Sequence, residues 1–340
     1  MSKRRLDVPS SGRVAELDLV SYGRRGRHTP LEFSHAQMEQ IARTVRGDPE
    51  VLVKVSGGAK SCDAARAHLA YIDRSGKLEV HTDEGEALQG KGVAQYLVND
   101  WHLDVGKGQY RPTLAEKDRR PKQVHNIVFS MPAGTPPRKL LAATQKFARE
   151  KFALRNRYAR VLHTDQKHPH VHLIVKAVSE QGERLCIRKP TLRQWREDFA
   201  QSLRELGVPA NATPTQLRGK SKSRDHAGIF HALKRGMSTF VRRKVEAVAE
   251  ELRCGQLTPE PGKAKLIGTR QRVRADWTAT AALLQAQRRQ SLARDVENYV
   301  RAMPPAATDK ELLAKGLLAE LAAQRVRDPA ANRERIEITR

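Results

Sequence analysis

The sequence is poor in the features that mark secreted, disulfide-bonded and membrane proteins. It has three cysteines, Cys62, Cys186 and Cys254, which lie far apart and predict neither a disulfide framework nor a cysteine-based metal site. No apolar run reaches the length of a membrane span, and the basic residues at the amino terminus are not followed by the apolar segment of a signal peptide. We therefore expect a soluble, cytoplasmic protein without membrane insertion.

Acidic residues are scarce relative to basic ones. The 340 residues include 63 lysines and arginines but only 38 aspartates and glutamates, which gives a formal net charge of +25. This excess predicts a polyanionic partner, with nucleic acid as the first candidate and an anionic membrane as the second. The length favours two domains.

Several common site motifs are also missing. There is no His-Glu-x-x-His of the helical zinc proteases, and no pair of cysteines flanks the histidines as in a zinc finger. Residues 56–61, Ser-Gly-Gly-Ala-Lys-Ser, lack the spacing of a nucleotide-binding loop because Ala59 precedes Lys60. They predict a tight turn, whose backbone amides at the start of a helix would suit a DNA phosphate.

The sequence does contain four histidines within ten residues, in His163-Thr-Asp-Gln-Lys-His-Pro-His-Val-His. Side chains alternate along a strand, so His170 and His172 point to one face. The polar residues 164–169 predict a turn that folds this strand back on residues 160–163, and facing Cβ atoms then lie about 5 Å apart. Three converging imidazoles predict a metal site with open coordination positions. The alternative is a polar hairpin that binds nothing.

The order of predicted elements indicates an α+β fold. Strands are expected at residues 51–55, 124–130, 158–165 and 170–179, and helices at 34–46, 63–74, 136–151 and 190–206. This mixture, with a tight hairpin near its end, predicts an antiparallel-rich sheet backed by helices.

After about residue 212 the pattern becomes helical and basic. Helices are expected over residues 227–252 and 276–302, and a third begins at Thr308, where Thr308 and Glu311 form a capping-box pattern. We therefore divide the chain into a basic flexible arm at 1–49, a domain at 50–215 and a basic α-helical region at 216–340.

Tyr71 is the candidate nucleophile. A metal site with open positions in a strongly basic protein indicates chemistry on a phosphodiester, with the metal as a Lewis acid. Helical spacing puts Tyr71 on one face with Ala64, Ala67 and His68, while the face with Ala65, Leu69 and Ile72 would pack on the sheet. A phenol has a pKa of about 10, so it needs a nearby base or cation to attack at neutral pH. His68, Asp165 and a hairpin histidine are the candidate bases, and a simple packing role is the alternative for Tyr71.

Three segments together resemble the conjugative and mobilisation relaxases of the HUH endonuclease superfamily, and most closely their VirD2-like (MOBP-type) group. The segments are Lys54-Val-Ser-Gly-Gly-Ala, His68-Leu-Ala-Tyr-Ile-Asp-Arg74 and the histidine-rich residues 163–175. The resemblance covers about residues 50–215 and implies an HUH-type sheet. It also implies a metal-dependent transesterase, in which a tyrosine attacks one DNA phosphodiester at a transfer origin. The tyrosine stays joined to the 5′ phosphate and leaves a free 3′ hydroxyl.

The resemblance implies a role for individual residues of this chain. Tyr71 matches the nucleophile, and Asp165 matches an acidic residue that orients a histidine or takes the tyrosine proton. The metal ligands would be His163, His170 and His172. DNA contacts are assigned to Lys54, Lys60, Arg74 and Ser130, the last as the best match to a serine motif that holds DNA beside the nick. The role of His168, in the turn, stays open between ligand, outer-shell group and DNA contact.

The family also implies a cofactor and partners. Magnesium or manganese is expected, and three imidazoles would suit zinc as well. The partners would be single-stranded and transfer-origin DNA, relaxosome accessory proteins and a type IV secretion coupling protein, in the bacterial cytoplasm. The alternatives are a rolling-circle replication initiator, a single-tyrosine transposase, a DNA-binding mobilisation accessory protein and a metal-dependent hydrolase of another substrate.

Overall fold

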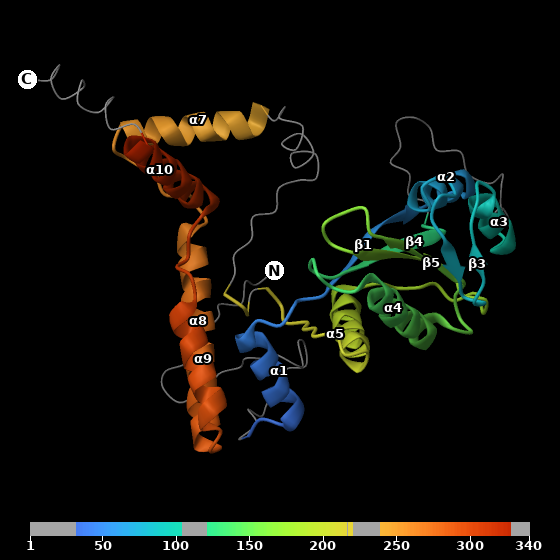
Figure 1. The fold of residues 1–340 in the computed structure, drawn as a ribbon, viewed down its shortest axis with the longest axis horizontal. Coiled ribbons are helices and arrows are strands. Elements are labelled where there is room, and N and C mark those ends of the chain that lie inside the picture. Colours follow the sequence, from blue (N-terminus) through green and yellow to red (C-terminus); the bar gives the residue numbers. More distant parts are fainter. Residues whose placement is uncertain (1–31, 104–120, 216, 220–238, 328–340) are drawn as a thin grey trace, which may run out of the picture. The chain divides into compact units, whose positions relative to one another are not determined.

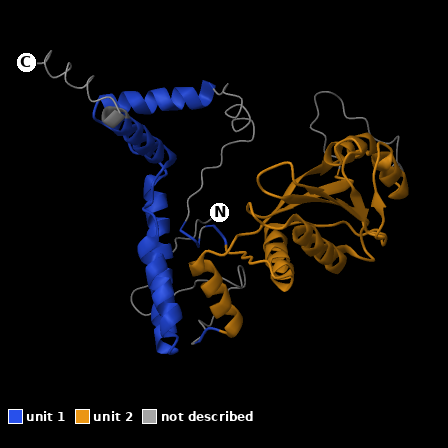
Figure 2. Ribbon diagram, viewed as in Figure 1, with its two compact units in different colours: residues 1–17, 28–33, 214–340 blue, residues 18–27, 34–213 orange. Residues whose placement is uncertain are grey.

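The computed structural model of the chain describes residues 32–103, 121–215, 217–219 and 239–327 (Figure 1). These residues form two compact units, one over residues 34–213 and the other beginning at Pro214 (Figure 2). Helix α1 (His35–Arg46) belongs to the first unit, which therefore begins before residue 50, the boundary expected from the sequence. The rest of the predicted arm, residues 1–31, lies outside the described residues.

The first unit is built on a six-stranded sheet with the strand order β1-β4-β6-β5-β2-β3, in which every neighbouring pair is antiparallel. In that order the strands are β1 (Leu52–Ala59), β4 (Val124–Ser130), β6 (His170–Lys176), β5 (Tyr158–His163), β2 (Val80–Thr82) and β3 (Ala87–Leu88). The α+β class predicted from the sequence is confirmed. The sequence predicted no regular element for β2, β3 or α3 (Val93–Asp100). Strands of two or three residues, such as β2 and β3, are too short to show alternation.

Helices cover both faces of this sheet (Figure 1). One face packs against α4 (Pro137–Phe152) and α5 (Lys189–Glu205), through a buried aromatic cluster centred on Phe129 and Phe147, whose ring centroids are 4.9 Å apart. The other face packs against α2 (Cys62–Ile72) and α3. The sheet therefore separates an aromatic core from the face that carries α2.

The burial of α2 matches its sequence pattern. Ala65, Leu69 and Ile72 are buried against the sheet, as predicted, because they recur at helical spacing on one side. Tyr71 lies on the exposed side, with 68% of its surface accessible. The end of α2 that carries Tyr71 therefore rests on the sheet with its phenol in solvent.

Strand β1 differs from the sequence prediction at residues 56–61. The strand continues through Ala59 with a bulge between Val55 and Gly57, where a tight turn was expected. Gly58 has φ of +136°, and a Cβ added there would lie 2.2 Å from the carbonyl oxygen of Val124. Gly58 therefore serves a close approach of two backbones, and the turn prediction was wrong because glycine marks both situations.

The second unit is helical in its described residues, as predicted. Its helices are α7 (Thr239–Arg253), α8 (Lys263–Ala286), α9 (Gln290–Ala302) and α10 (Asp309–Arg327). The single helix expected over 276–302 is two helices, because the chain reverses at Arg288, whose φ is +60°. Thr308 and Glu311 form the predicted capping box, and residues 227–238 of the first expected helix lie outside the described residues.

Within the described residues, no helix combines the length and the apolar character needed to cross a bilayer.

Candidate functional site

The β5–β6 hairpin brings three histidines together, as the sequence predicted. His163 pairs directly with His170, and His172 pairs with Val161 two residues further along. Their ring centroids lie 5.0 Å apart for His163 and His170, 4.6 Å for His163 and His172, and 5.2 Å for His170 and His172. We refer to His163, His170 and His172 as the histidine triad. It lies on the face of the sheet that carries α2.

Each ring of the triad donates one N–H to an oxygen acceptor. The bonds run from His163 Nε2 to the Ile72 carbonyl (2.7 Å), from His170 Nδ1 to the His168 carbonyl (3.1 Å) and from His172 Nδ1 to Asn126 Oδ1 (3.1 Å). The first two acceptors are carbonyls, which cannot donate, so the ring nitrogen must carry the proton. These bonds fix the tautomers and leave the lone pair of the second ring nitrogen for a ligand role, as in protein metal sites; in His163 that nitrogen, Nδ1, accepts from Arg74 Nη2 at 3.4 Å.

Burial favours the neutral form of His163 and His172. Burial, together with the smaller effect of the nearby His163 and His170, lowers the pKa of His172 to about 3. Burial also lowers the pKa of His163, although the Ile72 carbonyl opposes the shift. A metal ion binds the neutral form of imidazole, so the lowered pKa values of His163 and His172 favour the state that a ligand requires.

The residues present fit a divalent metal ion. Ring nitrogens of the triad all lie within 4.8 Å of one another. Three imidazoles suit zinc, manganese, cobalt or nickel by ligand type.

The residues that follow Tyr71 in the chain connect it to the triad. The next residue, Ile72, provides the carbonyl that His163 binds. Arg74 places its guanidinium carbon 5.5 Å from the centre of the Tyr71 ring and its Nη2 atom 3.4 Å from His163 Nδ1. The end of α2 is therefore docked on the β5–β6 hairpin, at the point where the sequence predicted nucleophile and ligands to meet.

Asp165 is ion-paired with Arg74. Its Oδ2 atom accepts a hydrogen bond from Arg74 Nη2 at 2.7 Å, while its Oδ1 atom is 3.9 Å from His163 Nδ1. Burial would raise the pKa of Asp165, but the hydrogen bond and charge of Arg74 outweigh it and lower that pKa. Asp165 is a poor proton acceptor in this arrangement, which weakens one of the two roles that the sequence suggested for it.

His168 lies outside the triad. Its Nδ1 atom accepts a hydrogen bond from the backbone N–H of Ala133 at 3.1 Å, and its carbonyl accepts one from His170. Ser130 is engaged with the same turn, because its hydroxyl donates to the Pro169 carbonyl at 3.1 Å. Both side chains hold the turn that precedes His170.

The two lysines assigned to DNA lie at different ends of β1. Lys54 is exposed and pairs with Val128, which in turn pairs with His172, so all three side chains lie on one face of the sheet. Two strand spacings of about 4.8 Å separate Lys54 from His172. Lys60 follows the far end of β1, about 20 Å along the strand from Lys54. The structure therefore brings Lys54, but not Lys60, to the neighbourhood of the triad.

Two further residues lie on this face: Asn126, to which the sequence analysis gave no role, and His68, which it named only as a candidate base. Asn126 is buried and binds His172, and its one signal was an amide inside an apolar strand. His68 lies one turn before Tyr71, and its Nε2 atom is buried without a hydrogen-bond partner among the described residues. Burial, followed by the charge of Lys122, lowers the pKa of His68.

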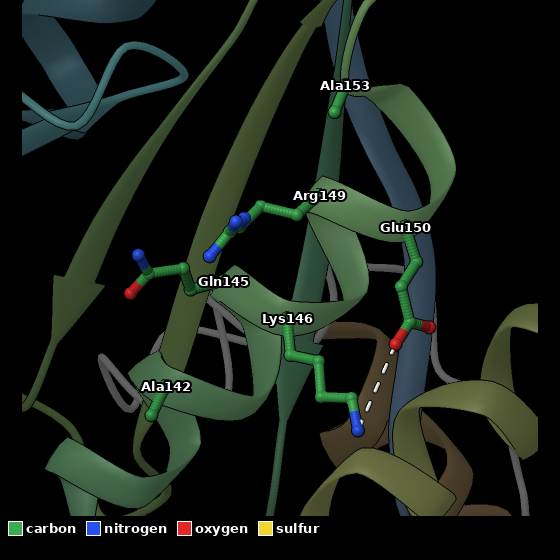
Figure 3. Close-up of a pocket in the computed structure, with 6 residues that line it drawn as sticks. All are labelled: Ala142, Gln145, Lys146, Arg149, Glu150 and Ala153. Carbon is green, nitrogen blue, oxygen red and sulfur yellow. Dashed lines mark ion pairs between the residues drawn. The ribbon is translucent and has the colours of Figure 1, made fainter.

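A hollow on the opposite side of the unit involves none of these residues. Figure 3 shows its lining on α4, where Lys146 and Glu150 form an ion pair at 3.9 Å. The other lining residues are Ala142, Gln145, Arg149 and Ala153. Since α4 packs on the aromatic face of the sheet, this hollow is separate from the triad.

Comparisons with known proteins agree with this site. Residues 89–208 match the family model of the MobA/VirD2-like relaxase nuclease domain, a range that includes the triad and Asp165 but begins after Tyr71. The T-DNA border endonuclease VirD2 of Rhizobium radiobacter is 26% identical over 184 residues, which are 50% of this chain and 43% of that protein. VirD2 of Rhizobium rhizogenes is 25% identical over 219 residues, 60% of this chain and 47% of that protein. The chain thus spans less than half the length of these curated relatives.

Among solved structures, the manganese-bound relaxase domain of MobM with plasmid pMV158 oriT DNA is similar at 12% identity and a TM-score of 0.35. The match covers 55% of this chain and 99% of that one. At this score the likeness adds nothing to the sequence matches. The family match over the histidine hairpin and the VirD2 relatives confirm the resemblance: residues 89–208 of this chain are similar to the relaxase nuclease domain of the MobA/VirD2-like family.

Proposed function

We propose that this protein is a site- and strand-specific DNA endonuclease that nicks one strand at the transfer origin of a plasmid or integrative element and so starts conjugative transfer. The observation that carries the proposal is the docking of the α2 terminus, with an exposed Tyr71, on the histidine triad. The relatives named T-DNA border endonuclease support a DNA substrate. The family match favours this reading over a replication initiator or a transposase that uses the same chemistry.

In the proposed reaction Tyr71 Oη attacks the phosphorus of one phosphodiester. A bond from Oη to phosphorus forms and the bond from phosphorus to the 3′ oxygen breaks, so a 5′-phosphotyrosyl DNA and a free 3′ hydroxyl result. The phenol proton passes to solvent, to which Tyr71 is exposed, and the leaving 3′ oxygen takes up a proton.

His163, His170 and His172 are the residues that would hold a divalent metal ion, and the ion would supply Lewis-acid activation of a non-bridging phosphate oxygen. Magnesium or manganese is our proposal for the ion in use. The hydrogen bonds that fix the three ring tautomers orient these ligands before the substrate arrives.

DNA contacts and partners complete the proposal. Lys54 lies on the triad's face of the sheet and suits a phosphate of the bound strand, whereas Lys60 would contact DNA further away. We propose that the partners are single-stranded and transfer-origin DNA, relaxosome accessory proteins and a secretion coupling protein, and that the protein acts in the bacterial cytoplasm. The net charge of +25 supports the DNA partner.

The test is covalent capture. The protein is incubated with Mn²⁺ and single-stranded oligonucleotides that tile both strands of the DNA flanking its gene, and adducts are resolved on denaturing gels. We expect an adduct with oligonucleotides of one strand only, from the wild type and from Tyr96→Phe, a control at an exposed tyrosine of α3. Tyr71→Phe should form none. An adduct from Tyr71→Phe, or none from the wild type, would refute the proposal.

A further inference from the structure

Arg74 lies on an unusual turn directly after α2. Arg74 and Ser75 both have positive φ, at +56° and +57°, a conformation that residues other than glycine rarely adopt. The turn is held by the Asp73 carboxylate, which accepts from the backbone N–H of Gly76 at 3.0 Å, and by the Ser75 N–H, which donates to the Ala70 carbonyl at 2.7 Å. Strained backbone of this kind persists where its surroundings hold it, often at functional sites.

This turn directs the Arg74 side chain back over the last turn of α2. There its guanidinium meets three groups at once. It donates to Asp165 Oδ2 at 2.7 Å, lies 3.4 Å from His163 Nδ1, and stands over the Tyr71 ring at 5.5 Å from its centre. The Arg74 side chain is about one-third exposed, so these contacts are partly shielded from water.

Guanidinium chemistry suits this bridging position. Its planar fork can pair with a carboxylate along one edge while its face lies against an aromatic ring. The hydrogen bond to Asp165 and, less strongly, the Tyr71 side chain raise the pKa of Arg74, so its charge is constant at any working pH. A lysine would keep the charge but could not make both contacts in this way.

We infer that Arg74 is a positioning residue that holds Tyr71 against the triad, with Asp165 as its anchor, and not a clamp for a DNA phosphate. The inference rests on the proposed function, since it concerns the same tyrosine. It replaces the role in DNA binding that the sequence suggested for Arg74. It also gives Asp165 a definite task, because the carboxylate that binds Arg74 ties the nucleophile helix to the strand that carries His163.

The test separates the rate of adduct formation from the binding of DNA. The variants are Arg74→Gln, Arg74→Lys, Asp165→Asn and the double variant Arg74→Gln/Asp165→Asn. Arg66→Gln is the matched control, because Arg66 is an exposed arginine of α2 that pairs with an acidic residue, Asp63. Three quantities are measured: the adduct rate at saturating oligonucleotide, the Kd of the oligonucleotide and its salt dependence, and the Kd of Mn²⁺ without DNA.

We expect Arg74→Gln to slow adduct formation at saturation by about 10- to 100-fold, the size of effect that a misplaced reacting group produces. The Kd of the oligonucleotide and the Kd of Mn²⁺ should both stay within about 2-fold of the wild-type values. Loss of a binding contact worth about 1.4 kcal/mol would change a Kd tenfold. Arg74→Lys should form the adduct faster than Arg74→Gln but more slowly than the wild type. Arg66→Gln should keep the wild-type rate. The double variant should be no slower than Arg74→Gln, because residues that act as a unit are not additive.

Three results would overturn the inference alone. The first is a full adduct rate in Arg74→Gln. The second is a weaker oligonucleotide Kd with a salt slope reduced by about one at an unchanged saturated rate, which marks a phosphate contact. The third is a loss of Mn²⁺ affinity equal to the loss of rate, which marks a structural effect through His163. The absence of any adduct from both the wild type and Arg66→Gln would instead overturn the proposed function, and this inference with it.

Discussion

The side-chain oxygen of Asn126 lies 3.1 Å from Nδ1 of His172, and this hydrogen bond joins two strands that are 46 positions apart in sequence. It leaves Nε2 of His172 as the ligand atom. Outer-shell partners of this kind contribute about 10- to 100-fold to metal affinity.

Removing this acceptor should weaken metal binding. We expect Asn126→Leu to raise the Kd of Mn²⁺, measured by calorimetry, by about 10- to 100-fold, and Asn126→Asp to retain affinity because a carboxylate also accepts. Asn156→Ala is the control, since Asn156 binds the Lys176 carbonyl at the other end of β6. It should change the free energy of unfolding but not the metal affinity. Unchanged affinity in Asn126→Leu would contradict this role.

His168 should behave as a support and not as a ligand. Its Nδ1 atom accepts from the N–H of Ala133. The side-chain amide oxygen of asparagine is as many bonds from Cβ as Nδ1 of histidine is, and it also accepts a hydrogen bond. We therefore expect His168→Asn to bind one Mn²⁺ with near wild-type affinity and His168→Ala to bind it a few-fold more weakly. A ligand role would show itself differently, because both variants would then lose the metal as fully as His170→Ala.

The stability of the metal-free protein should fall in mild acid. The pKa of His172 is about 3 in the folded protein and 6.5 in the unfolded chain, so between these values the unfolded state binds more protons. The contribution of His172 is fully present above pH 6.5 and is lost as the pH falls toward 3. The free energy of unfolding can be measured with urea at a series of pH values, with a chelator present. As the pH falls, it should decline less steeply for His172→Asn than for the wild type. Parallel curves would mean that His172 does not titrate as stated.

The first unit should need α1 for its stability. Ile41 is fully buried, and the Asn211 side chain donates to Thr44 Oγ1 at 3.1 Å. A fragment of residues 34–215 should unfold cooperatively in urea. A fragment of residues 50–215 should be less stable, because it loses about 1.5–3 kcal/mol from Ile41 and about 1–3 kcal/mol from the unpaired amide. Equal stabilities would place α1 outside the folding unit.

The hairpin and the triad could be predicted from the sequence because their residues lie close together in the chain. His163 and His170 are seven positions apart, one turn joins their strands, and alternation along β6 then fixes where His172 points. The buried face of α2 was equally accessible, since Leu69 and Ile72 carry it at helical spacing. Short-range periodicity was sufficient in both cases.

The remaining contacts depend on how distant segments pack. No residue near Asn126 in the sequence indicates that its side chain binds His172. The positive φ of Arg74 could not be predicted either, because a positive φ is expected at glycine and this position is an arginine. Gly58 was assigned to a turn because glycine marks turns and close backbone contacts alike. Tertiary structure decides between such alternatives, so the partners of Arg74 and Asp165 came from the structure alone.

The most direct test of the account is to locate the covalent bond. Cleavage after Arg66 and Arg74 releases residues 67–74, a tryptic peptide in which Tyr71 is the one tyrosine. After adduct formation with Mn²⁺, nuclease trimming and digestion, mass spectrometry should find this peptide carrying a 5′-phosphorylated nucleotide remnant, while the released DNA ends in a 3′ hydroxyl. A remnant on any other peptide, or a 3′-phosphate linkage, would contradict the account.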